Sequence, residues 1–307
     1  MGEAFSPDEG KDALGITITK HHQVSEDWNP KPPGILVQTR MLFAREFNNL
    51  QRDTTALGAR FGLTIFLSVL IGTIFLDVGS SDKAEQVNLQ STFGALIMVL
   101  LMSMFGTAQP SLLAFPEERP VFLREYSTNH YSVVAYFVSR LTMEAFITGL
   151  QVLVMTCITY FMISFQMEYR WLYLTTYVLA MASTALAVTL GCSVEDPKLA
   201  TEMLPILFVP QMLFAGFFVA PDLIPSWLRW ARYLCTLTYA VRIYLVEEFY
   251  DCDPGNPTAN DKCNTLIREV DADPDETWWN WLVLVGLFCF FRVTALIILQ
   301  QKAVKFY

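Results

Sequence analysis

Residues 115–132 read FPEERPVFLREYSTNHYS, a charged stretch set between two long apolar runs. Its formally charged side chains are Glu117, Glu118, Arg119, Arg124 and Glu125, whereas only 17% of the whole chain is charged and 53% is hydrophobic. The runs on either side reach about 20 residues, which is enough for a helix to cross a bilayer core of roughly 30 Å. The sequence therefore predicts an all-α, polytopic membrane protein.

Six apolar segments of the chain are long enough to span a membrane. We expect transmembrane helices near 57–76, 91–114, 138–165, 171–191, 203–220 and 278–299. The third apolar block is too long for one perpendicular crossing, and Arg140 and Glu144 lie four residues apart in its first half. That spacing predicts a helical half that projects from the membrane. Arg292, in the last span, is expected to snorkel toward the cytoplasm.

The region before the first span divides into two parts. Residues 1–33 are polar and contain several prolines, which predicts a disordered linker. Residues 34–56 have helical periodicity, with apolar side chains on one broad face, which predicts an amphipathic connecting helix at the membrane surface. The predicted domains are thus the linker, this connecting helix, and a six-span domain over 57–307.

Basic residues set the predicted orientation. Lys and Arg are concentrated before the first span, in the 115–132 loop and in the C-terminal tail, whereas the 77–90 and 166–170 loops carry only Lys83 and Arg170. Both termini are therefore predicted to be cytoplasmic, in an integral protein of the plasma membrane or of an endomembrane.

Residues 220–249 are rich in aromatics but carry three arginines, so they fit neither a regular span nor a soluble loop. Turns at Pro221 and Pro225 predict a re-entrant segment before the last span, within an external loop over 221–277. Cys252 and Cys263 share this loop, and an oxidising compartment would favour a disulfide between them; free surface thiols are the alternative. The other four cysteines are expected to be small core residues.

Motifs for catalysis are not apparent in the sequence. No GxxxxGK[ST] phosphate loop and no recognisable nucleophile–base set is present, and the paired histidines at 21–22 have no third ligand nearby. We therefore expect no enzymatic activity, no metal site and no cofactor within this chain. Nor does any basic face predict nucleic-acid binding.

Two motifs resemble a known family. EERPVFLREYSTNHYSVVAYF (117–137) resembles the cytoplasmic loop after the second span of white–brown (G) subfamily ATP-binding-cassette exporters, and PQMLFAGFFVAPDLIPSWLRWARYLCTLTYA (210–240) resembles their fifth span, outer gate and re-entrant segment. The resemblance covers roughly residues 34–307. It implies a half that pairs as a homo- or heterodimer in membrane lipid and exports hydrophobic or amphipathic molecules such as lipids, sterols or xenobiotics.

The resemblance also implies an ATPase domain, which would bind ATP and Mg and is not recognisable in this chain. It could be a separate polypeptide, or this sequence could be a partial product; both remain open. A non-transporting regulatory or truncated partner of full-length exporters is the alternative function. A channel or secondary carrier is disfavoured because the spans contain little buried charge. The transported substrate is not readable from the sequence.

The resemblance implies roles for three sets of residues. A coupling helix that rests on the ATPase would include Glu117, Glu118, Arg119, Phe122, Arg124 and Glu125, with a merely solvated loop as the alternative. A substrate cavity would include Met102, Met104, Phe105, Phe208, Val209 and Met212, with ordinary helix packing as the alternative. An outer gate would include Gly216, Phe217 and Phe218, with an interfacial aromatic belt as the alternative.

Overall fold

The computed structural model describes residues 34–80, 86–127, 131–194, 196–219, 224–250 and 257–305. Over these ranges the chain is helical and contains no β-strand. Residues Met1–Pro33 form a separate unit outside the described residues, so their predicted disorder stays a prediction. The all-α fold class predicted from the sequence is confirmed.

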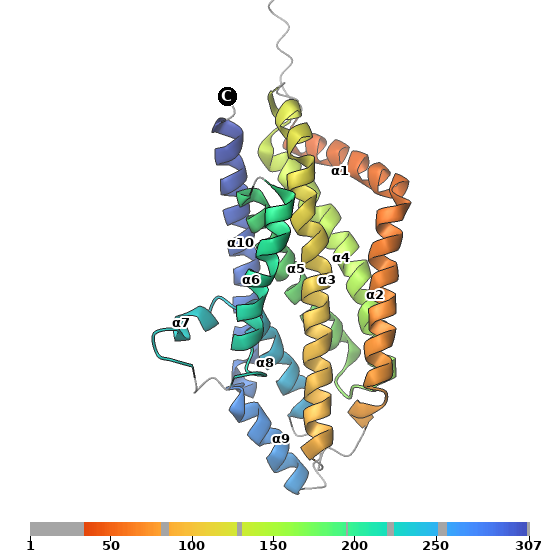
Figure 1. Ribbon diagram of the computed structural model, residues 1–307, viewed down its shortest axis with the longest axis vertical. Coiled ribbons are helices and arrows are strands. Elements are labelled where there is room, and N and C mark those ends of the chain that lie inside the picture. Colours follow the sequence, from red (N-terminus) through yellow and green to blue (C-terminus); the bar gives the residue numbers. More distant parts are fainter. Residues whose placement is uncertain are drawn as a thin grey trace, which may run out of the picture. The chain divides into compact units, whose positions relative to one another are not determined.

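Ten α-helices and two short 3-10 helices are present in the described ranges (Figure 1). In chain order they are α1 (Ile35–Arg52), α2 (Thr54–Ile74), η1 (Val78–Ser80), α3 (Gln86–Ser127), α4 (Val133–Ile163), α5 (Tyr169–Ser193), α6 (Pro197–Phe214), α7 (Arg229–Arg232), α8 (Thr236–Phe249), α9 (Pro257–Glu269), η3 (Pro274–Glu276) and α10 (Thr277–Lys305).

Five segments are long and apolar enough to cross a membrane. They cover Thr54–Ser80, Asn88–Leu113, Val133–Ile163, Tyr169–Ser193 and Pro274–Lys302, and they coincide with five of the six predicted spans. The remaining prediction, 203–220, corresponds to α6, which begins earlier and ends at Phe214. Because α6 carries Pro205 and Pro210 and is not among the five, the count of six crossings stays a prediction.

The charged stretch at 115–132 is largely part of a helix. The sequence suggested a loop after the second span, but α3 runs for 42 residues and continues to Ser127. Glu, Arg and Leu are good helix formers, so the helix can extend beyond its apolar part. The predicted second span and most of the charged stretch therefore form one continuous helix.

Helix α5 lies among the other long helices. It packs against α3 and α10 and also contacts α4, α6 and α8. Small residues make this packing close: Ala180, Ala182, Ala185 and Ala187 are fully buried. At Gly191 an added Cβ would lie 2.7 Å from the carbonyl oxygen of Leu112, so α3 and α5 approach almost to backbone contact.

The two ends of the helical unit differ. Helix α1, the charged end of α3 and the end of α10 lie together, whereas α8 and α9 lie at the opposite end (Figure 1). The predicted connecting helix, α1, thus lies at the same end of the helical unit as the C-terminal part of α10. This agrees with the prediction that both termini are on one side of the membrane. Which side of the membrane this end faces stays a prediction.

Helix α8 lies within the segment predicted to be re-entrant. Of its 14 residues, 12 are buried, and it packs against α5 and α10. This part of the predicted external loop is therefore a core element, while the re-entrant path itself stays a prediction.

The cysteines fall into two groups. Cys192 and Cys235 are buried, as expected, but Cys157 and Cys289 are exposed, so the expectation of four core cysteines is wrong for those two. Cys263 is buried and disulfide-bonded. Its predicted partner, Cys252, lies outside the described residues, so that pairing stays a prediction.

Candidate functional site

The residues proposed for a substrate cavity lie on two helices that contact each other, α3 and α6. Met104 and Phe208 are fully buried. The rings of Phe105 and Phe208 meet edge to face, with centroids 5.2 Å apart. Phe208 and Met104 therefore help to join the two helices within this chain.

The other proposed cavity residues are more accessible. Met102, Phe105 and Met212 are partly buried, whereas Val209 is 46% exposed. Val209 belongs to an apolar stripe on α6 whose members are all exposed and recur at helical spacing. These stripe residues are Leu199, Ile206, Val209 and Leu213. Beside the α3–α6 contact there is thus an apolar face that the described part of the chain leaves exposed.

The predicted gate residues follow the end of α6. Gly216 has φ of +87°, a conformation that favours glycine, and an added Cβ would lie 2.9 Å from Val270. Phe217 packs edge to face on Phe93 of α3, with ring centroids 5.4 Å apart, and Phe218 packs on Phe217 at 4.8 Å. Phe218 itself is 53% exposed. The two phenylalanines therefore have different environments.

Helix α8 holds the end of α6 in place. The Thr236 hydroxyl donates to the side-chain oxygen of Gln211 at 2.8 Å, and the Thr238 hydroxyl donates to the Phe214 carbonyl at 3.2 Å. These bonds fix α6 just before Gly216, where the helix ends.

A buried carboxylate fixes α8 in turn. Glu248 is only 4% exposed, and it accepts hydrogen bonds from the backbone N–H groups of Gln166 (3.1 Å) and Met167 (2.9 Å). The α4–α5 connection is thereby attached to α8. Glu247, next to Glu248 in the sequence, has a raised pKa because of burial and the nearby charge of Glu168.

The charged end of α3 is connected to α1 and to the segment that precedes α4. The Arg45 guanidinium donates to both oxygens of Glu125, at 2.9 and 2.8 Å, and the Tyr131 hydroxyl donates to the same carboxylate at 2.7 Å. Burial alone would lower the pKa of Arg45, but the hydrogen bond and charge of Glu125 outweigh it and raise that pKa. Burial, and then Glu125, raise the pKa of the Tyr131 hydroxyl.

The remaining predicted coupling residues lie along the same part of α3. The side chains of Glu117, Glu118, Arg119, Phe122 and Arg124 lie outside the described part of the structure. Of that set, only the Glu125 side chain is placed, and it links α3 to α1 and to Tyr131, two residues before α4.

Two ion pairs lie among the helices near this end. Arg140 binds Glu46 of α1 at 3.2 Å, and Arg292 of α10 binds Glu144 of α4 at 2.6 Å. Arg292 also donates to the Thr184 hydroxyl at 3.0 Å and is 6% exposed. The expectation that Arg292 snorkels is therefore wrong, because a buried carboxylate on another helix is its partner.

Arg60 of α2 also points inward. Its Nε donates to the side-chain oxygen of Gln151 at 2.6 Å. The amide nitrogen of Gln151 donates in turn to Thr64 at 3.0 Å and to the Gly106 carbonyl at 3.2 Å. Gln151 thus joins α2, α3 and α4 and orients the guanidinium.

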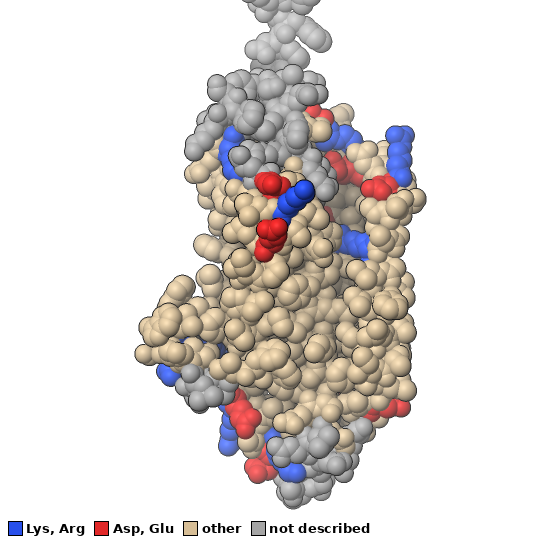
Figure 2. Space-filling model, in the orientation of Figure 1, with Lys and Arg blue, Asp and Glu red and all other residues tan. Residues whose placement is uncertain are grey.

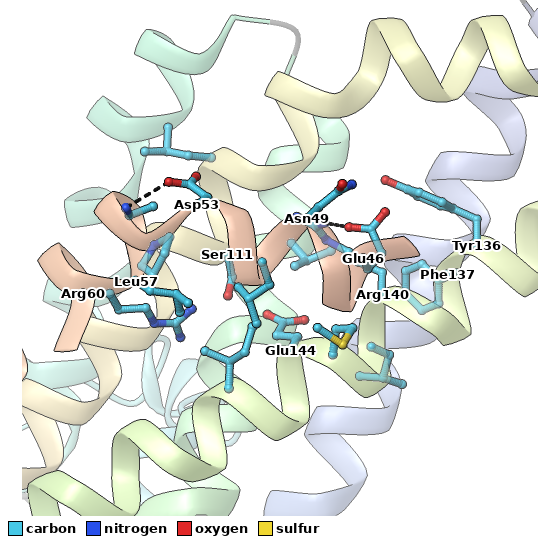
Figure 3. Close-up of a pocket in the computed structure, with 18 of the residues that line it drawn as sticks. Glu46, Asn49, Asp53, Leu57, Arg60, Ser111, Tyr136, Phe137, Arg140 and Glu144 are labelled. Carbon is cyan, nitrogen blue, oxygen red and sulfur yellow. Dashed lines mark hydrogen bonds and ion pairs between the residues drawn. The ribbon is translucent and has the colours of Figure 1, made fainter. Parts of the chain in front are cut away.

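A cavity of about 450 Å³ lies beside these charged groups (Figure 3). Its wall contains residues of α1, α2, α3, α4, α5 and α10. Charged residues on the wall are Glu46, Asp53, Arg60, Arg140, Glu144 and Arg292. This cavity was not predicted from the sequence; the only available signal was the presence of charged and amide side chains inside apolar segments.

Within the described ranges, no three His, Cys, Asp or Glu side chains are grouped closely enough to hold a metal ion.

Comparison with known proteins agrees with this architecture. Residues 37–249 match the family described as "ABC-2 type transporter". The chain is 24% identical to ABC transporter G family member 1 of Dictyostelium discoideum, with 88% of this chain and 36% of the relative covered. It is 28% identical to the broad substrate specificity ATP-binding cassette transporter ABCG2 of Bos taurus (84% and 41% covered) and 26% identical to protein white of Drosophila melanogaster (87% and 40% covered). The chain thus spans about two fifths of the length of these relatives.

Proposed function

Since this chain belongs to the ABC-2 type transporter family, we propose that it forms the membrane-spanning permease half of an ATP-driven exporter. It is an integral, multi-pass membrane protein. The cargo we propose is hydrophobic or amphipathic, such as lipids, sterols or xenobiotics. One relative of similar sequence is itself named for broad substrate specificity.

The observation that carries this proposal is the apolar stripe of α6. Leu199, Ile206, Val209 and Leu213 are exposed on α6, and none of the described residues covers them; this face lies beside the α3–α6 contact. A second half, identical or related, would place its own α3 and α6 opposite and enclose an apolar space between the halves. Methionines and aromatic rings on such a wall adapt to varied apolar shapes.

Coupling to an ATPase domain is the second part of the proposal. The charged end of α3 is the proposed contact, with Glu117, Glu118, Arg119, Phe122 and Arg124 facing the ATPase. Support comes from the contacts of Glu125 with Arg45 and Tyr131. Through them, movement of this end of α3 would be transmitted to α1 and to the residues that lead into α4. In this arrangement both termini are cytoplasmic, and ATP and Mg bind to the ATPase domain.

The test is reconstitution with an ATPase domain, supplied either as a separate chain or by fusion to the part of the ABCG2 relative, named an ATP-binding cassette transporter, that lies outside the matched region. In proteoliposomes, the proposal expects ATP-dependent movement of a fluorescent lipid and of a lipophilic dye. A catalytically inactive ATPase partner serves as the control. Stable assembly and normal hydrolysis without movement of either probe would favour the non-transporting partner instead.

Coupling is tested separately with the double variant Glu118→Ala/Arg119→Ala. We expect ATP hydrolysis to continue while transport falls strongly, with membrane insertion unchanged. Unaltered transport by this variant would exclude the coupling role.

A further inference from the structure

The side chain of Arg60 is directed from α2 into the interior of the helical unit rather than toward the surrounding lipid (Figure 3). Gln151 binds its Nε, but the terminal Nη2 is buried and has no hydrogen-bond partner among the described residues. A buried guanidinium nitrogen without a partner is unfavourable, so this atom is a candidate for binding a ligand.

The acidic groups on the cavity wall each contact another group, although the second oxygen of Glu144, Oε1, is buried and has no hydrogen-bond partner among the described residues. Glu46 is bound to Arg140 and Glu144 to Arg292, while Asp53 accepts the N–H of Ala56 and caps α2. Glu144 also acts on Arg60 through its charge, but its contact is with Arg292, at 2.6 Å. Arg60 is therefore the wall cation for which the described residues supply no carboxylate contact.

The uncharged part of the wall is mostly apolar, with Asn49 and Ser111 as polar exceptions. Leu57, Leu113, Leu141 and Ile147 form part of its wall. Figure 2 shows a recess beside α2 on this face, with basic side-chain atoms visible inside it. At about 450 Å³ the cavity is within the range of roughly 300–1,000 Å³ typical of small-molecule sites. Leu63 and Phe66, further along α2, are exposed apolar side chains on the same helix.

We propose that this cavity binds the anionic head, a carboxylate or a phosphate, of a membrane amphiphile. The oxygens of the head accept hydrogen bonds from Arg60, and the first part of the hydrocarbon chain lies against Leu57 and Ile147. A charge-assisted bond of this kind is strong where water is excluded. The site is distinct from the α3–α6 face, and its occupancy does not depend on transport.

The experiment measures equilibrium binding to the purified full chain in phosphatidylcholine nanodiscs. The probes are a tail-labelled fluorescent fatty acid, its methyl ester, and a tail-labelled phosphatidic acid. We expect both anionic probes to bind and the methyl ester to bind at least about tenfold more weakly, since it lacks the charge. An ester that binds as tightly as the acid would overturn the proposal.

Variants identify the residue responsible. Arg60→Gln should weaken binding of the anionic probes about tenfold, whereas Arg60→Lys should retain most of it. Arg52→Gln is the matched control, because Arg52 is exposed on α1 and does not line the cavity. Equal binding by the wild type and Arg60→Gln would overturn the proposal.

Two further measurements complete the test. Leu57→Trp keeps every charge and fills the cavity, so it should also abolish binding; retained binding would place the probe elsewhere and overturn the assignment. Gel filtration establishes that each variant remains monodisperse. Displacement of the lipid probes by millimolar inorganic phosphate would identify a free oxyanion as the ligand and overturn the amphiphile.

Discussion

At the scale of single residues, we expect Phe217 to contribute mainly to the stability of the fold and Phe218 mainly to the proposed gate. Phe217 packs on Phe93, whereas Phe218 is 53% exposed and contacts Phe217. We expect Phe217→Ala to cost about 2 kcal/mol of unfolding free energy, from lost burial and the lost ring pair. Phe218→Ala should leave thermal stability nearly unchanged. Thermal unfolding in detergent measures both.

The gate proposal adds an expectation for Phe218. In a transport-competent complex, Phe218→Ala should increase passive leak of the lipophilic dye or broaden the range of probes moved. If leak, probe range and basal hydrolysis all remain at wild-type values, Phe218 belongs to an interfacial aromatic belt instead.

Glu248 gives a second prediction at this scale. Replacement by Gln keeps the shape but removes the charge that receives two backbone N–H groups, so we expect a loss of about 1–2 kcal/mol. The measurement is the free energy of unfolding in denaturant. A loss smaller than 0.5 kcal/mol, roughly the scatter of surface substitutions, would contradict this account.

Glu247→Gln is the matched control, and its sign depends on pH. Because the pKa of Glu247 is raised in the folded protein, the folded state favours the protonated form, and stability falls as pH rises from the ordinary carboxyl pKa through the raised value. Glu247→Gln removes that loss. It should therefore be neutral in acid and slightly stabilising near pH 7, in contrast to Glu248→Gln.

At the scale of elements, the α3–α5 contact depends on one glycine. A Cβ at position 191 would lie 2.7 Å from the Leu112 carbonyl oxygen, and backbone cannot easily move away. Gly191→Ala should therefore lower the melting temperature even though alanine is the better helix former, because the two helices must separate.

Gly94→Ala is the control, since an added Cβ there meets nothing within 4 Å. It should leave the melting temperature unchanged or raise it slightly. If Gly191→Ala and Gly94→Ala behave alike, close backbone packing of α3 on α5 is not required.

Elements were predictable from sequence where apolar runs are long and uninterrupted. The cores of α2, α4, α5 and α10 lie where hydrophobicity alone placed them. The ends were not predictable at α3, which continues through three prolines, or at α6, which ends at Phe214 after Pro205 and Pro210. Hydrophobicity measures the preference for lipid, whereas the end of a helix depends on backbone hydrogen bonds and neighbours.

The site was less predictable because its key contacts join distant segments. Arg292 and Glu144 are 148 residues apart in sequence, so no local pattern pairs them. Arg60 and Gln151 are separated by 91 residues. By contrast, Phe105, Phe208 and Phe217 were identified from the family resemblance, and the structure brings them to the α3–α6 region.

At the scale of the whole molecule, charge is distributed in a way that fits a bilayer. On the face shown in Figure 2, charged side chains gather near the two ends, and a broad uncharged band lies between them. Charged ends and an uncharged middle band fit a protein whose middle lies in the hydrocarbon core of the bilayer. In that position its lateral faces are the ones that can contact another membrane protein.

A second copy of this half is such a partner. In a symmetric pair each half presents the same surface, so identical residues near the axis approach each other. We propose that the α6 stripe lies near this axis. In a background with exposed Cys157 and Cys289 replaced by serine, Ile206→Cys should form a disulfide-linked dimer in membranes under mild oxidation. Phe161→Cys, on α4 and 73% exposed, is the control for random collision and should remain monomeric. If both cysteines cross-link to the same extent, the stripe faces lipid; if only Ile206→Cys does so, the half pairs through α6, and the apolar space between two such faces is available for cargo.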